Sequence, residues 1–240
     1  VDAGTFHNFH YYWVGELGRA LNDGLLPPEL YAMVEQRAGR FEPDVLTLGL
    51  SRPDPQQEVS GGVALAECPP QVELRISLDE NDHYAAMRRT VVVRHRSGHR
   101  IVAMIEVLSP GNKDSEARFD QLVEKVVTAI GRGVHVMLID LHPPRSFDPQ
   151  GIHAAIWNVL GGNGYEQPSD RLLTLAAYRA DVRPEAFVQS TAVGFELPDM
   201  PLFVSASRYV TVPLKATYQA AWPSMPAVWR DVIEGRREAE

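Results

Sequence analysis

Residues 101–141 read IVAMIEVLSPGNKDSEARFDQLVEKVVTAIGRGVHVMLIDL, and this stretch decides the fold. It begins and ends with apolar runs, 101–108 and 134–141, of the kind that form buried strands. Between them, over 117–131, apolar residues recur every three or four positions, which predicts an amphipathic helix with Asp114 or Ser115 as its N-cap. A strand, a helix and a strand make a βαβ unit, so we expect two parallel strands joined by a right-handed crossover.

Weaker signals on both sides extend this unit. The segment 88–96, the turn Ser97-Gly98-His99-Arg100 and the run 101–108 together predict a β-hairpin. Upstream, 10–22 has the apolar spacing of a helix that ends at Asp23-Gly24. The other predicted strands are 31–37, 44–50, 71–78, 172–178, 186–193, 202–204 and 209–212. The last predicted helices are 214–222 and 227–234.

This order of elements predicts one α/β domain over residues 1–240, built on a single mixed sheet. Its core, 10–141, has the order αβββαβ. Residues 51–100 form an insertion that carries the hairpin, and its first part, 51–87, is rich in proline, glycine and acids. Residues 142–240 form a C-terminal extension of strands and helices that enlarges the sheet.

Composition excludes several classes of protein. The single cysteine, Cys68, cannot form an internal disulfide, and no apolar run approaches the 18 or so residues of a membrane span. We therefore expect a cytoplasmic protein of bacterial type with no membrane partner. The 23 basic and 31 acidic residues give a net charge of −8, which excludes a broadly basic nucleic-acid binder because phosphate affinity depends on cations.

The charge is unevenly distributed. Residues 88–113 carry a net charge of +5, because six cations stand against one acid, Glu106. Three of these cations, Arg94, Arg96 and Arg100, belong to the predicted hairpin. Two interpretations stay open: they bind DNA or RNA, or they protect an exposed strand edge from pairing with other chains.

Two carboxylates form the main chemical candidate. Asp44 opens a predicted strand directly after Pro43, and Glu106 lies inside a predicted central strand. A carboxylate at such a position is costly to bury unless it is paired or bound to a metal. Carboxylates on adjacent strands suit Mg²⁺ or Mn²⁺, and such an ion can activate water for phosphodiester hydrolysis.

At this point the sequence resembles a known superfamily. The αβββαβ order, the Pro-Asp on the second strand and the acid on the third resemble the restriction-endonuclease-like PD-(D/E)XK nucleases over residues 10–141. The segment 105–113 (IEVLSPGNK) resembles a family of bacterial endonucleases in that superfamily. It is also similar to a bacterial domain-of-unknown-function family with an Ile-Glu-Val-Leu-Ser-Pro-x-Asn-Lys signature. That second resemblance covers nearly the whole chain and includes Phe9-His10 and 139–141 (IDL).

The resemblance implies a metal site and a catalytic lysine. Asp44 and Glu106 become ligands of Mg²⁺ or Mn²⁺, and Glu35 a third carboxylate. Asp140, at the end of the next strand, is a fourth carboxylate within reach.

The superfamily places its lysine two residues beyond the acid, where this chain has Leu108. Related families carry that lysine on the following helix, where Lys125 lies beside Gln121 on one flank. Lys113, in the loop, is a second candidate.

Each candidate also has a structural interpretation. Asp44 can bond a turn, and Glu106 can pair with an arginine of 88–100. Lys125 can be a solvated helix residue, and Asp140 can cap a strand end. The sequence therefore predicts a metal-dependent, nuclease-like hydrolase, with an inactive nuclease-fold binding or scaffolding module as the alternative. A different hydrolase or transferase on a similar sheet is a weaker third interpretation.

Overall fold

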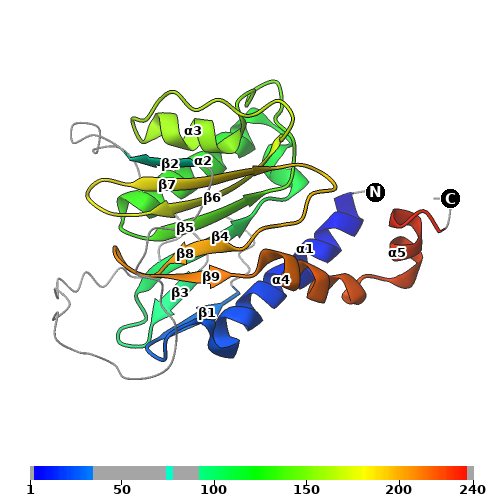
Figure 1. The fold of residues 1–240 in the computed structure, drawn as a ribbon, viewed down its shortest axis with the longest axis horizontal. Coiled ribbons are helices and arrows are strands. Elements are labelled where there is room, and N and C mark those ends of the chain that lie inside the picture. The colour runs from blue at the N-terminus through cyan, green and yellow to red at the C-terminus, as the bar shows by residue number, and fades with distance from the viewer. Residues whose placement is uncertain (1–2, 35–73, 78–91, 237–240) are drawn as a thin grey trace.

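The predicted βαβ unit forms the centre of the sheet. In the computed structural model, which describes residues 3–34, 74–77 and 92–236, β4 (Ile101–Val107) and β5 (His135–Asp140) pair in parallel. Helix α2 (Glu116–Gly131) connects them (Figure 1). The Ser115 side chain accepts a hydrogen bond from the Arg118 N–H, so Ser115 is the N-cap. These observations confirm the two parallel strands and the helix between them.

The predicted hairpin exists, but it is not an arm added to the core. Strand β3 (Val92–His95) pairs antiparallel with β4 and also with β1 (Leu30–Met33). The seven-stranded sheet has the order β1-β3-β4-β5-β6-β7-β2, so β3 lies inside the sheet. The short strand predicted within 71–78 is found as β2 (Leu74–Ser77), at the opposite edge beside β7. The insertion therefore contributes two strands to the sheet: β3 lies next to one edge strand, and β2 is the opposite edge strand.

The C-terminal extension enlarges the sheet only in part. Strands β6 (Leu173–Arg179) and β7 (Glu185–Thr191) continue it with antiparallel pairing, as predicted. Strands β8 (Met200–Phe203) and β9 (Tyr209–Val212) instead form a separate two-stranded sheet, which packs on β4, β5 and β6. The expectation of one sheet was wrong for β8 and β9, because both are short and apolar and cover a sheet face rather than an edge.

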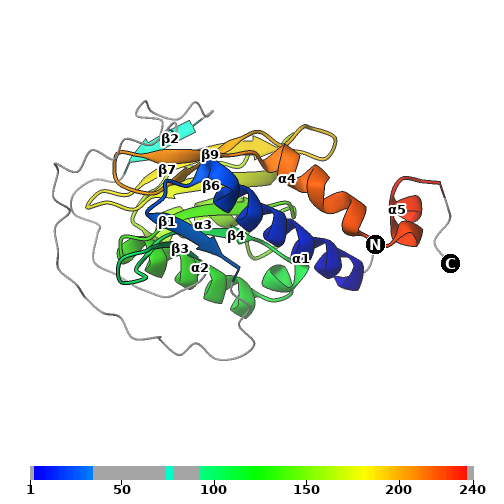
Figure 2. The same cartoon turned by 90° about the horizontal axis from the view of Figure 1, so that it is seen from below.

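Helices and the small sheet cover the two faces of the large sheet. One face packs against α1 (Ala3–Ala20), α4 (Leu214–Ala221) and the β8–β9 sheet, and the other against α2 and α3 (Gly151–Val159). Figure 2 shows α4 and β9 on one side and α2 on the other. Helix α3 was not predicted, because most of its residues are buried and apolar and it lacks the polar face that makes a helix recognisable.

Short turns join these elements. Helix α1 continues into a π-helical turn, η1 (Leu21–Leu25), which ends where Gly24 adopts a φ of 107°, as the Asp23-Gly24 pair predicted. Two 3₁₀ turns follow later, η2 (Pro110–Lys113) and η3 (Trp222–Ser224). The predicted last helices are present as α4 and α5 (Ala227–Ile233). Among the described residues, no helix is long and apolar enough to cross a membrane.

Candidate functional site

A carboxylate and an ammonium meet between β4 and α2. Glu106 lies one residue before the end of β4, on the α2 side, between the buried Met104 and Leu108. The Lys125 Nζ lies 2.7 Å from Glu106 Oε1 and donates a hydrogen bond to it. The side chain of Glu106 is 12% exposed and that of Lys125 is 15% exposed. The partner of Glu106 is thus the lysine of the following helix, and the interpretation of Lys125 as a solvated residue was wrong.

This pair is chemically suited to hold an anion. An ammonium has three N–H donors, and Glu106 Oε1 takes one of them. Partial burial strengthens the electrostatic interactions of both groups compared with the same groups in water. Burial also costs solvation, and the opposite charge at hydrogen-bond distance offsets that cost. The pair therefore fixes the Lys125 ammonium beside β4, with two N–H donors beyond the one that Glu106 accepts, while the two charges offset each other.

Lys113, the second lysine candidate, lies in a different and fully buried cluster. Its Nζ is 2.7 Å from Asp140 Oδ2 and donates to the main-chain oxygens of His142 (3.2 Å) and Pro143 (3.5 Å). The Nζ is also 2.9 Å from Asp148 Oδ2, an ion pair without hydrogen-bond alignment. The cluster joins η2, the end of β5 and the segment that leads to α3.

The charges of this cluster influence one another. Burial raises the pKa of Asp140 to about 6, against the opposing effect of the Lys113 ammonium. Asp140 Oδ1 also accepts a hydrogen bond from the His142 N–H at 3.0 Å, so the interpretation of Asp140 as a strand-end cap is confirmed. The Lys113 side chain has no exposed area. Contact between Lys113 and a substrate would require the cluster to open.

Two histidines bind the end of β4, and sequence reasoning missed these contacts. His10 Nε2 lies 2.7 Å from the Val107 carbonyl oxygen, and His142 Nε2 lies 3.3 Å from that of Leu108. Because a carbonyl only accepts, Nε2 of each ring is the donor in its contact. Burial lowers the pKa of His142. The Phe9-His10 pair in the sequence carries no local signal of a contact 97 residues away.

The hairpin arginines do not surround Glu106. Arg96 and Arg100 lie in the turn between β3 and β4, and Arg94, within β3, donates from Nη1 to the His99 carbonyl of that turn at 2.8 Å. Arg96 and Arg100 are exposed. Arg100 precedes Glu106 by six residues of an extended strand, about 20 Å at 3.3 Å per residue. The hairpin arginines of the positive segment 88–113 therefore lie at one end of β4, and Glu106 lies near its other end.

The predicted metal site is represented by one residue. Asp44 and Glu35 lie outside the described residues, so their positions relative to Glu106 are not part of this structure. In the described ranges, no three His, Cys, Asp or Glu side chains form a group able to hold a metal ion. Of the predicted ligands Asp44, Glu106 and Glu35, only Glu106 is thus described, and the fourth carboxylate, Asp140, is paired with Lys113.

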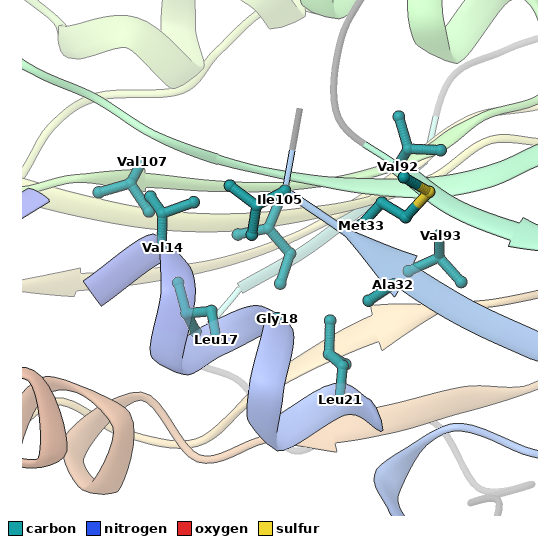
Figure 3. Close-up of a pocket in the computed structure, with 11 residues that line it drawn as sticks. Val14, Leu17, Gly18, Leu21, Ala32, Met33, Val92, Val93, Ile105 and Val107 are labelled. Carbon is teal, nitrogen blue, oxygen red and sulfur yellow. The ribbon is translucent and has the colours of Figure 1, made fainter. Parts of the chain in front are cut away.

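An apolar pocket lies on the other face of the sheet. Figure 3 shows it between α1 and strands β1, β3 and β4. Ile105 and Val107, the neighbours of Glu106 in β4, line it together with Val14, Leu17 and Leu21 of the first helix and its π-helical turn. Side chains alternate along a strand, so Glu106 points away from this pocket. The pocket offers apolar contact and no acid–base chemistry.

Comparisons with protein-family models, with curated proteins and with solved structures find no match to this chain. A functional proposal for the site therefore rests on its own geometry and on the sequence resemblance.

Proposed function

We propose that this protein is a nuclease-like hydrolase that cleaves phosphodiester bonds of DNA or RNA, with Glu106 and Lys125 at its catalytic site. The observation that carries the proposal is the 2.7 Å contact between Lys125 Nζ and Glu106 Oε1. It joins an acid on the central strand to a lysine on the following helix, the arrangement that the resemblance implied.

The two side chains have different roles. Lys125 binds a phosphoryl oxygen and stabilises the negative charge that develops on it during hydrolysis. Glu106 holds the ammonium in position through the hydrogen bond to Oε1. A preorganised charge of this kind stabilises a transition state more than a mobile one does, because it needs no reorganisation during the reaction.

The proposal includes a Mg²⁺ or Mn²⁺ ion held by Glu106 and Asp44, with Glu35 as a further ligand. The described residues supply only Glu106, and one carboxylate does not make a site for a hard cation. Calorimetric titration of the protein with Mn²⁺, compared with the Glu106→Gln variant, measures whether Glu106 is a ligand.

The alternative is an inactive nuclease-fold module that binds or organises a partner. One observation favours it: the ion pair already neutralises the Glu106 carboxylate, as in a purely structural pair. This alternative predicts binding without turnover. It also predicts that Glu106 and Lys125 affect stability alone.

A cleavage assay separates the two. Plasmid, single-stranded DNA and RNA are incubated with the wild-type protein and Mg²⁺ or Mn²⁺, and with Glu106→Gln and Lys125→Met. We expect each substitution to lower the rate by at least about 100-fold, the usual effect of removing one charge-stabilising group. Lys215→Met is the matched control, because Lys215 forms an exposed pair with Glu196.

Circular dichroism verifies that each variant is folded. Cleavage that is equal in all variants contradicts the assignment of Glu106 and Lys125. An absence of cleavage by the wild-type protein with either ion favours the binding module.

A further inference from the structure

Helix α2 and its C-cap residue carry a row of cations on the flank that faces Glu106. Arg118, Lys125 and Arg132 are spaced seven residues apart. Seven residues at 3.6 per turn are close to two full turns, so all three side chains leave the helix on one flank. The contact between Lys125 and Glu106 identifies this flank as the one beside β4. The row extends about 21 Å along α2, at 1.5 Å per residue.

The row leads towards the arginines of the hairpin. Because β4 and β5 are parallel, α2 runs in the opposite direction, and its C-terminal end lies near the beginning of both strands. Arg132 follows the last residue of α2 and precedes β5 by three positions. His135, the first residue of β5, pairs with Ala103, so Arg132 and Arg100 each lie three residues before a paired position of two adjacent parallel strands. The α2 row and the β3–β4 turn therefore meet at one end of the sheet.

We propose that these cations form one basic track that holds a single strand of nucleic acid across the Glu106–Lys125 site. This inference rests on the proposed function and names the form of its substrate. The track consists of Arg118, Lys125, Arg132, Arg96 and Arg100.

The charges favour a strand over a duplex. A single row of cations follows one phosphate backbone, whereas a duplex presents two backbones separated by its grooves. Without the five cations of the track, the remaining chain has a net charge of −13. That charge repels a second backbone from the rest of the surface.

Arg118 of the track can release its present partner. Arg118 pairs with Asp114 at 3.0 Å, with 61% and 55% of the two side chains exposed. An exposed pair of this kind contributes about 0–1 kcal/mol, so a phosphate can replace the carboxylate at little cost. At the turn, the Tyr31 hydroxyl and His99 Nδ1 are 2.7 Å apart and their rings pack edge to face. This aromatic pair provides a surface on which a base can stack.

Fluorescence anisotropy in EDTA, where the metal-dependent reaction is blocked, measures the binding directly. The probes are a labelled 20-mer of deoxythymidine, a 20-mer of uridine and a 20-base-pair DNA duplex. With five phosphate contacts, the affinity for a single strand should fall about 100-fold between 50 and 200 mM salt. The double variant Arg118→Gln/Arg132→Gln should lower the slope of log K against log salt by about 1.4.

The matched control is Arg19→Gln/Arg236→Gln. These arginines are 57% and 59% exposed and ion-paired, as Arg118 is, but they lie on α1 and after α5. The control should keep the wild-type slope. The two 20-mers distinguish DNA from RNA as the strand that is held, and binding of either with the shifted slope supports the track.

Equal slopes for the two double variants, absence of strand binding, or tighter binding of the duplex overturns the inference. Cleavage of nucleic acid without a change of slope leaves the proposed function standing and removes the track. A changed slope without cleavage leaves the track standing and removes the hydrolase.

Discussion

Replacing Lys113 by methionine tests the buried charge cluster most sharply. Methionine keeps an unbranched apolar side chain but removes the ammonium that lies 2.7 Å from Asp140 and 2.9 Å from Asp148. Breaking a buried ion pair by removing one partner costs about 3–5 kcal/mol, because an uncompensated charge stays buried. The Lys113 ammonium contacts two carboxylates and two carbonyl oxygens. We therefore expect Lys113→Met to lower the free energy of unfolding by about 5 kcal/mol. That is a large part of the 5–15 kcal/mol stability typical of a folded domain.

The loss should depend on pH, and the pKa of Asp140 gives the sign. Burial raises this pKa to about 6 from its usual 3.8. The folded state thus favours the protonated acid, and the stability gained from that proton is lost as the pH rises through about 6. In the wild-type protein this pH-dependent part of the free energy of unfolding is on the order of 3 kcal/mol. Without Lys113 the pKa rises further, so the deficit of Lys113→Met should be larger at pH 8 than at pH 5.

Urea unfolding followed by circular dichroism at both pH values measures this. Lys215→Met, which removes an exposed ammonium, should change the free energy of unfolding by less than about 0.5 kcal/mol. A deficit for Lys113→Met below about 1 kcal/mol, or one that is equal at pH 5 and pH 8, refutes the reasoning.

Three further predictions concern residues elsewhere in the chain. Burial lowers the pKa of His153, which is hydrogen-bonded to the Tyr178 hydroxyl, to about 3. Stability should therefore fall as the pH decreases from about 6.5 towards 3, and thermal melts should show a shallower decline for His153→Gln. A Cβ at Gly162 would lie 2.1 Å from Trp157 Nε1, so Gly162→Ala should cost about 3 kcal/mol in urea unfolding. Gly15→Ala, within α1 and with open space around it, should instead stabilise by about 0.5–1 kcal/mol.

The central unit was predictable because its signals are local. The spacing of apolar residues in 117–131 identifies a helix with one buried face, and that face is buried in the structure. The apolar runs on both sides predict strands, and a helix between strands requires the parallel pairing that is found. The pairing partners of a strand are not predictable in this way, since the sequence pattern of β3 is equally compatible with a hairpin outside the sheet. Its pairing with β1, more than 55 residues earlier, is decided by the whole sheet.

The two lysine candidates show that local sequence does not identify contacts between distant side chains at the site either. Lys113 and Lys125 both follow Glu106 within 19 residues, and nothing in their neighbours separates their roles. The structure separates them by burial: Lys113 is enclosed by carboxylates from β5 and the segment before α3, whereas Lys125 reaches the central strand.

The sequence by itself determined the βαβ unit, the acid inside its first strand and the presence of a lysine on its helix. These features depend on the spacing of apolar residues and the order of charges within short segments of the chain. Only the tertiary structure decided which lysine meets Glu106, that β3 belongs inside the sheet, and that β8 and β9 cover a face instead of extending an edge. The physical reason is distance along the chain. Hydrogen bonds and ion pairs between segments tens of residues apart depend on how every layer packs, and no short stretch of sequence contains that information.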